Sequence, residues 1–139
     1  MRRAFTLLEL TIVVTVLALL MAITVPKFAA FRDRASVRAA MADLGALFSV
    51  ARQSAITERA TVSVRFDTAA GSVEIRRAGR VITRHALRRT YGITLGSNRD
   101  STVYDSRGFG YGVSNITVTI RRGSIVDTLT MSRLGRVRW

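Results

Sequence analysis

The sequence predicts an α+β protein in which one long N-terminal helix, membrane-spanning in its first half, packs against an antiparallel β-sheet head. Three observations predict this fold. Residues 5–25 form an apolar run interrupted by a single charge, Glu9. Helical spacing of apolar residues continues to about Thr57, and strict alternation begins at Thr61. A length of 139 residues holds one head domain and an appendage rather than two domains.

The apolar run has the length of a membrane span. Its 21 residues would extend about 31 Å as a helix, close to the hydrocarbon thickness of a bilayer. Arg2 and Arg3 precede the run, which predicts a cytoplasmic N-terminus and an extracytoplasmic head. A cleaved secretory signal is disfavoured because Val25-Pro26-Lys27 offers no small-residue cleavage site. A plain signal anchor leaves Glu9 unexplained, although a carboxylate at that depth is costly.

The helix is expected to continue beyond the membrane as an amphipathic segment. Pro26 is the only proline in the chain, so we expect one helix from Phe5 to Thr57 with a bend near Pro26. Spacings of three and four residues mark a single apolar stripe, which predicts the face that packs on the sheet. The stripe consists of Val37, Met41, Leu44, Phe48, Ala51 and Ala55.

Alternating apolar residues then predict five to seven strands, mostly antiparallel. The clearest are centred on residues 62–66, 73–75, 81–85, 116–120 and 125–132, with weaker signals at 93–95 and 102–104. The glycine-rich segment 104–112 resembles a dinucleotide-binding loop, but such a loop must be followed by a helix. A strand near Asn115 follows instead, so we expect a structural loop in which Phe109 and Tyr111 cover the edge of the core.

The segment Ala4-Phe5-Thr6-Leu7-Leu8-Glu9 resembles the processing site of type IV prepilins and type II secretion pseudopilins. The resemblance implies cleavage between Ala4 and Phe5 by a prepilin peptidase, followed by N-methylation of Phe5. Ala4 stands where the family usually has glycine, and Pro26 stands where it commonly has a helix-bending proline. The implied parts are a cleaved leader (1–4), a transmembrane and filament-core helix (5–27), and an amphipathic helix with a pilin-like β-rich head (28–139).

The resemblance also implies a role for Glu9 in assembly. After cleavage Phe5 would carry a cationic amine, and the family is thought to pair its glutamate with the amine of a neighbouring subunit. Two charges in an apolar medium are costly unless they neutralise one another, so such pairing favours assembly in register. Alternatively, Glu9 of an isolated subunit snorkels to the membrane interface. The implied partners are prepilin peptidase, inner-membrane lipid and other pilin subunits, in the inner membrane first and in a filament afterwards.

The C-terminal part resembles the GspH/FimT subgroup of minor pilins. The resemblance rests on Tyr104-Asp105-Ser106-Arg107-Gly108, on the ITVTI strand and on the ending SRLGRVR. It implies a minor pseudopilin of a type II secretion pseudopilus that supports protein secretion. The alternative is a DNA-binding minor pilin of a pilus used in DNA uptake. In that case Gly135, Arg136 and Arg138 match the DNA-contacting stretch, and Trp139 could stack on a base.

The charge favours anionic partners in either case. The formal net charge is +13, and Lys27 is the only lysine. Between residues 59 and 139 there are 15 arginines and 5 acidic residues. In an extended segment Arg136 and Arg138 would project to one side, about 6.6 Å apart, which suits contacts with phosphates. A second patch is expected from Arg76, Arg77, Arg80, Arg84, Arg88 and Arg89. Alternatively, these arginines are solvated or pair with acidic neighbouring subunits.

The composition argues against an enzyme. Without cysteine the chain has no disulfide, thiolate metal site or cysteine nucleophile. His85 is the only histidine, and the acidic residues are scattered without a repeated spacing. No paired carboxylates or metal-ligand cluster accompany His85, so no metal or other cofactor is expected. The sequence therefore predicts a structural and interaction protein.

Overall fold

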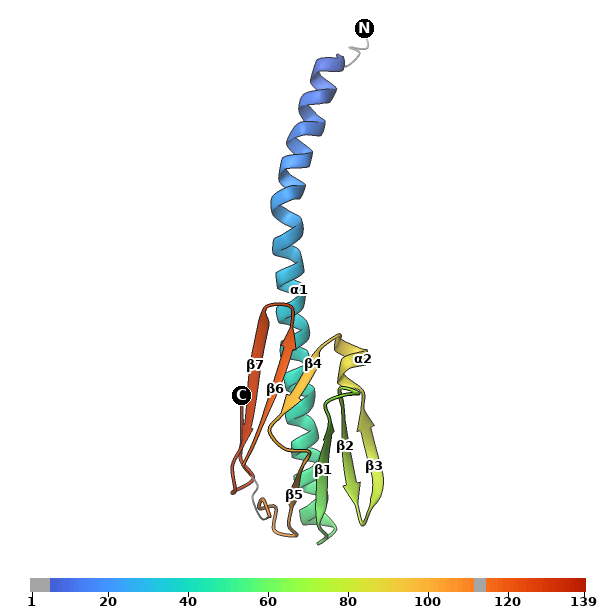
Figure 1. Cartoon of the computed structure of the whole chain (residues 1–139), viewed down its shortest axis with the longest axis vertical. Coiled ribbons are helices and arrows are strands. Elements are labelled where there is room, and N and C mark those ends of the chain that lie inside the picture. The colour runs from blue at the N-terminus through green and yellow to red at the C-terminus, as the bar shows by residue number, and fades with distance from the viewer. Residues whose placement is uncertain (1–5, 112–114) are drawn as a thin grey trace. The chain divides into compact units, whose positions relative to one another are not determined.

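The computed structural model describes residues 6–111 and 115–139 (Figure 1). A single 51-residue helix, α1, is followed by a head with eight strands and one short helix. In chain order the elements are α1 (Leu7–Thr57), β1 (Val62–Asp67), β2 (Ser72–Arg77), β3 (Arg80–His85), α2 (Leu87–Tyr91), β4 (Thr94–Ser97), β5 (Ser101–Tyr104), β6 (Ile116–Arg122), β7 (Ile125–Met131) and β8 (Val137–Arg138).

The chain divides into two compact units, Met1–Arg32 and Asp33–Trp139. In the first unit, the large apolar side chains between Leu7 and Val25 are 48% to 81% exposed. This part of α1 is long and apolar enough to cross a membrane. Its threonine hydroxyls donate to carbonyls one turn back, as Thr15 does to Thr11 at 2.7 Å. Hydroxyl groups that make their hydrogen bonds within the helix need no water, which suits the interior of a membrane.

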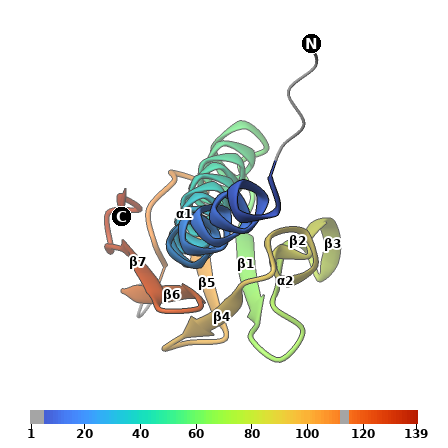
Figure 2. The same ribbon diagram turned by 90° about the horizontal axis from the view of Figure 1, so that it is seen from above.

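The head consists of two four-stranded antiparallel sheets. One has the strand order β3-β2-β1-β5 and the other the order β4-β6-β7-β8. Inward positions alternate with outward ones: on β6, Ile116, Val118 and Ile120 are buried while Thr117 and Thr119 are not. In the view of Figure 2 the strands of the two sheets lie around one side of the part of α1 that belongs to the head, residues 33–57.

The second part of α1 supplies one wall of the head core. All six residues of the predicted apolar stripe, from Val37 to Ala55, are buried, which confirms that stripe. They join one hydrophobic cluster with side chains of both sheets, including Phe66, Ile75 and Leu129. Because every residue of this cluster lies at or beyond Val37, the head has a core of its own.

The α+β fold class is confirmed, with differences in detail. Of the five to seven strands predicted, all seven candidate segments are strands, but they form two sheets rather than one. Helix α2 and strand β8 were not predicted. Both are too short, at 5 and 2 residues, for a periodic pattern to show in the sequence. Pro26 lies inside α1, and the bend expected there stays a prediction.

Candidate functional site

The N-terminal processing residues Ala4 and Phe5 lie outside the described residues. Glu9 is exposed in the first turn of α1, and its backbone N–H donates to Thr6 Oγ1 at 3.2 Å. Thr6 directly precedes the helix, so Thr6 and Glu9 occupy the positions of a capping box. This local role was not predicted from the sequence, although the spacing Thr-x-x-Glu is its usual signal.

The C-terminal segment turns sharply before the predicted arginines. The Gly135 N–H donates to the Ser132 carbonyl at 2.9 Å, and the Ser132 N–H donates to the Arg136 carbonyl at 2.9 Å. Gly135 has a φ of +71°, and a Cβ there would lie 2.6 Å from the carbonyl oxygen of Gly108. Glycine is therefore required both by the backbone conformation and by the close approach of another chain segment.

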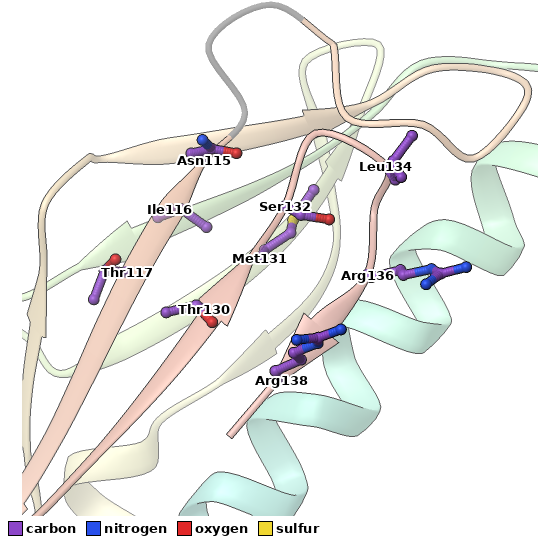
Figure 3. Close-up of a pocket in the computed structure, with 9 residues that line it drawn as sticks. All are labelled: Asn115, Ile116, Thr117, Thr130, Met131, Ser132, Leu134, Arg136 and Arg138. Atoms are coloured by element: carbon purple, nitrogen blue, oxygen red, sulfur yellow. The ribbon is translucent and has the colours of Figure 1, made fainter.

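Arg136 and Arg138 lie on the same side of this segment, as expected (Figure 3). Arg138 pairs with Thr130 in the β7–β8 ladder, and both arginines are exposed. They line a hollow of about 540 Å³ beside the ends of β6 and β7. None of the residues that line this hollow is acidic. Two like charges without a counter-charge make it a candidate site for an anionic partner.

Trp139 is less available than the sequence suggested. Its indole ring packs on α1 at Gly45, where a Cβ would lie 2.6 Å from ring atom Cζ3. The residue is nevertheless 64% exposed. One part of the ring therefore lies against the helix, and the exposed remainder is what a ligand could contact. Gly45, which weakens a helix by propensity, is explained by this contact.

The second predicted arginine patch is partly tied into the head. Arg77 and Arg84 form ion pairs with Glu58 and Glu74. Arg88 donates to a backbone carbonyl at 2.7 Å. Only Arg80 and Arg89 of the six arginines make no side-chain hydrogen bond or ion pair with the described residues. Internal contacts therefore account for most of this arginine patch, whereas they do not account for Arg136 and Arg138.

The loop between β5 and β6 is organised by Asp105. Its Oδ1 accepts the backbone N–H groups of Arg107 and Phe109, each at 2.9 Å. These bonds, the one from Phe109 foremost, lower the pKa of Asp105. The expectation that Phe109 and Tyr111 cover the core was wrong, because they are 42% and 72% exposed. Tyr104 is the aromatic residue buried there. Among the described residues the next element after Tyr111 is strand β6 and not a helix.

His85 belongs to a small polar cluster rather than standing alone. Its Nδ1 lies 3.1 Å from Asp43 Oδ1 on α1, and the Tyr91 hydroxyl donates to Asp43 Oδ2 at 3.4 Å. Burial and the neighbouring Asp43 carboxylate raise the pKa of Tyr91. The cluster joins the end of β3 and α2 to α1, which is a structural task. Across residues 6–111 and 115–139 no group of three or more potential ligands could hold a metal.

No protein-family model and no curated protein matches this chain. Among solved structures it is similar to two crystal forms of FimU, a type IV minor pilin of Pseudomonas aeruginosa. The form in space group P21 matches with a TM-score of 0.65 and 19% identity, over 78% of this chain and 90% of that chain. The form in space group P65 matches with a TM-score of 0.60 and 17% identity, over 73% of this chain and 90% of that chain.

At these identities the likeness establishes the fold. A long N-terminal helix packed on antiparallel strands is the arrangement that FimU and this chain share. The GspH/FimT subgroup remains a prediction from the sequence. The protein described here has the type IV pilin fold.

Proposed function

We propose that this protein is a minor subunit of a type IV pilin-like filament and is assembled through α1. One observation carries the proposal: on a pilin fold, the apolar side chains of residues 7–25 are uncovered. A helix that is apolar on all sides needs lipid or other helices around it. We propose the inner membrane for the precursor, with the head outside the cytoplasm, and a bundle of neighbouring helices for the assembled subunit.

Processing and Glu9 follow from the same proposal. Cleavage by a prepilin peptidase between Ala4 and Phe5 would leave a cationic, N-methylated amine one turn before Glu9. The carboxylate then neutralises the amine of a neighbouring subunit. Glu9 lies in the first turn of α1, four residues after the new N-terminus. A shift of about 6 Å along the axis between neighbouring helices would therefore bring the carboxylate of one subunit to the amine of the next. The parts would be a leader (1–4), a filament helix (5–27) and an amphipathic helix with its head (28–139).

The filament we favour is a type II secretion pseudopilus, in which the subunit supports protein secretion. The DNA-uptake pilus is the second candidate, and the uncompensated charge of Arg136 and Arg138 is the observation that favours it. Contacts of two guanidiniums with the phosphate backbone of DNA would give an affinity that depends on salt and not on base sequence.

The assembly proposal is tested by expressing the full chain with a prepilin peptidase and the other filament subunits. The mass of the protein in the membrane and in the sheared filament fraction reports cleavage. Because the chain has no cysteine, a single introduced cysteine, Val13→Cys, gives a clean cross-linking position on α1. We expect cross-links to other subunits only after assembly. A chain that retains Met1 to Ala4, or that never enters filaments, contradicts the proposal.

A gel-shift titration separates the two filament classes. The head from about Phe28 is suitable, since its core begins at Val37. Submicromolar, salt-sensitive binding to DNA that is lost when Arg136 and Arg138 are both changed to Ala supports DNA uptake. Absence of binding at about 100 mM salt, where exposed charges remain only partly screened, supports the secretion assignment.

A further inference from the structure

A second hollow lies on the head between α1 and the C-terminal segment. Its volume is about 430 Å³. We name it the α1–β8 hollow; the polar groups that line it come from Ser49 and Arg52 on α1, Tyr104 on β5, and Arg136 and Arg138 beside Trp139. All of these residues belong to the head unit, so the hollow is complete within one compact body.

The charge of the α1–β8 hollow is uncompensated. Three guanidiniums line it, and none of its lining residues is acidic. Arg52 uses its Nε to donate to the Gly108 carbonyl at 3.0 Å. Its two terminal nitrogens, like the side chains of Arg136 and Arg138, make no hydrogen bond or ion pair with residues 6–111 or 115–139. Like charges held around one concavity favour an anion there.

A buried hydroxyl supplies an independent indication of a ligand. Tyr104 is fully buried, and its hydroxyl has no hydrogen-bond partner among the described residues. Buried polar groups are nearly always paired, so this one calls for an explanation. Burial raises the pKa of Tyr104 to about 12, which keeps the hydroxyl a donor at neutral pH. An anionic oxygen in the hollow would accept that proton donor.

The backbone of β8 adds a strand edge. Arg138 pairs with Thr130, and the Arg136 carbonyl accepts from the Ser132 N–H, so both residues direct their backbone groups toward β7. In an antiparallel ladder, successive residues direct their backbone N–H and C=O groups alternately toward the partner strand and away from it. Val137, which also lines the hollow, therefore presents its N–H and C=O on the outer edge. An extended peptide could pair with that edge.

We propose that the α1–β8 hollow binds a side-chain carboxylate on an extended segment of an acidic partner protein. Planar guanidiniums pair with carboxylates in a bidentate manner, and the strand edge holds the peptide backbone. Residues 33–139 carry 18 arginines and 8 acidic residues, so heads of this chain repel one another. A second copy is thus a poor occupant. Taken with the proposed function, on which the nature of the partner rests, the occupant is a different and acidic filament subunit.

The binding test uses the full chain in a non-ionic detergent. The probe is a fluorescently labelled, end-blocked peptide of alternating Glu and Ala, and its control has Gln at every Glu. Anisotropy measures affinity, and the emission of Trp139, the only tryptophan, reports whether the hollow is occupied. We expect saturable binding of the Glu peptide with a shift in Trp139 emission, at least about tenfold tighter than the Gln peptide. Equal affinities, or no emission change, overturn the proposal.

Variants locate the interaction. R136Q with R138Q should weaken the Glu peptide about tenfold or more, since two charge-assisted bonds are lost. R80Q with R89Q removes the same charge elsewhere on the head and should leave the affinity within about twofold. Y104F should weaken binding about threefold to tenfold without lowering Tm, because it deletes an unpaired buried hydroxyl. Unchanged affinity in Y104F, or equal losses in both double variants, contradicts the assignment.

Two further arms identify the anion and separate this inference from the proposed function. Inorganic phosphate should compete only weakly with the Glu peptide. If a single-stranded oligonucleotide binds more tightly than the Glu peptide, the proposal of a protein partner is overturned. Filament incorporation is scored for the same variants. If the variants lose peptide binding but all of them still enter filaments normally, the hollow is not a contact between subunits. The proposed function is then unaffected. If the chain binds the peptide but never enters filaments, the proposed function is wrong. The assignment of the hollow as a carboxylate-binding site is then unaffected.

Discussion

Residues 7–25 and 37–55 of α1 are both rich in apolar side chains, yet only the second segment has a buried face. In the first segment no side chain is covered by the described structure. In the second, one stripe is almost completely buried and the other faces are open. Apolar content alone therefore does not decide burial. The second segment carries its large apolar residues, apart from the exposed Val50, on one face that a sheet can cover, whereas the first is apolar on all sides.

The largest difference between the two segments should appear in stability. Phe48→Ala removes a fully buried ring that contacts the core and lies 6.0 Å from the ring of Phe66. We expect a loss of about 3–5 kcal/mol in the free energy of unfolding. Leu17→Ala, on the exposed segment, should leave head stability unchanged. Denaturant unfolding of the full chain in detergent, followed by circular dichroism, measures both. A comparable loss in the two variants would remove the distinction between the segments.

A smaller effect is expected where the C-terminal segment meets the head. Gly135→Ala forces a side chain into a positive-φ position and toward the Gly108 carbonyl. The expected cost is about 1–3 kcal/mol in unfolding free energy. Gly79→Ala is the matched control, because Gly79 also has a positive φ but a Cβ there meets nothing within 4 Å. Equal costs at the two positions would show that backbone strain alone, and not the close approach, accounts for Gly135.

The smallest effect concerns Asp105 and acid. Hydrogen bonds from the backbone N–H of Phe109 and from Arg107 lower the pKa of Asp105 in the folded head. A lowered pKa means that the carboxylate stabilises the head above its ordinary pKa of about 3.9, and that this contribution is lost as the pH falls through the folded value. Asp105→Asn should remove that part of the pH dependence. Melting temperatures between about pH 2 and 7 test this, and identical profiles for the two proteins would contradict it.

The sequence was most informative where a pattern repeats. The apolar stripe from Val37 to Ala55 and the alternation on β6 predicted buried faces correctly, because helical and strand periods are visible over several residues. Strand β8 and the division into two sheets depend on contacts between distant segments, which no local period records.

The candidate site shows the same limit. The charge of Arg136 and Arg138 could be seen in the sequence. Neither the packing of Trp139 on Gly45 nor the unpaired Tyr104 hydroxyl could, since each joins residues far apart in the chain. The alternation that marked Thr102 to Tyr104 as a strand gave Tyr104 no further role.

We propose that the uncovered apolar part of α1 assembles the subunit, with Glu9 as the charge partner of a neighbouring amine. The most direct measurement compares the wild-type chain with Glu9→Ala in the membrane and sheared filament fractions, with mass spectrometry of each. We expect equal cleavage after Ala4 in both proteins and a large loss of Glu9→Ala from the filament fraction alone. Normal incorporation of Glu9→Ala into filaments, after cleavage at the same position, would contradict a role for Glu9 in assembly.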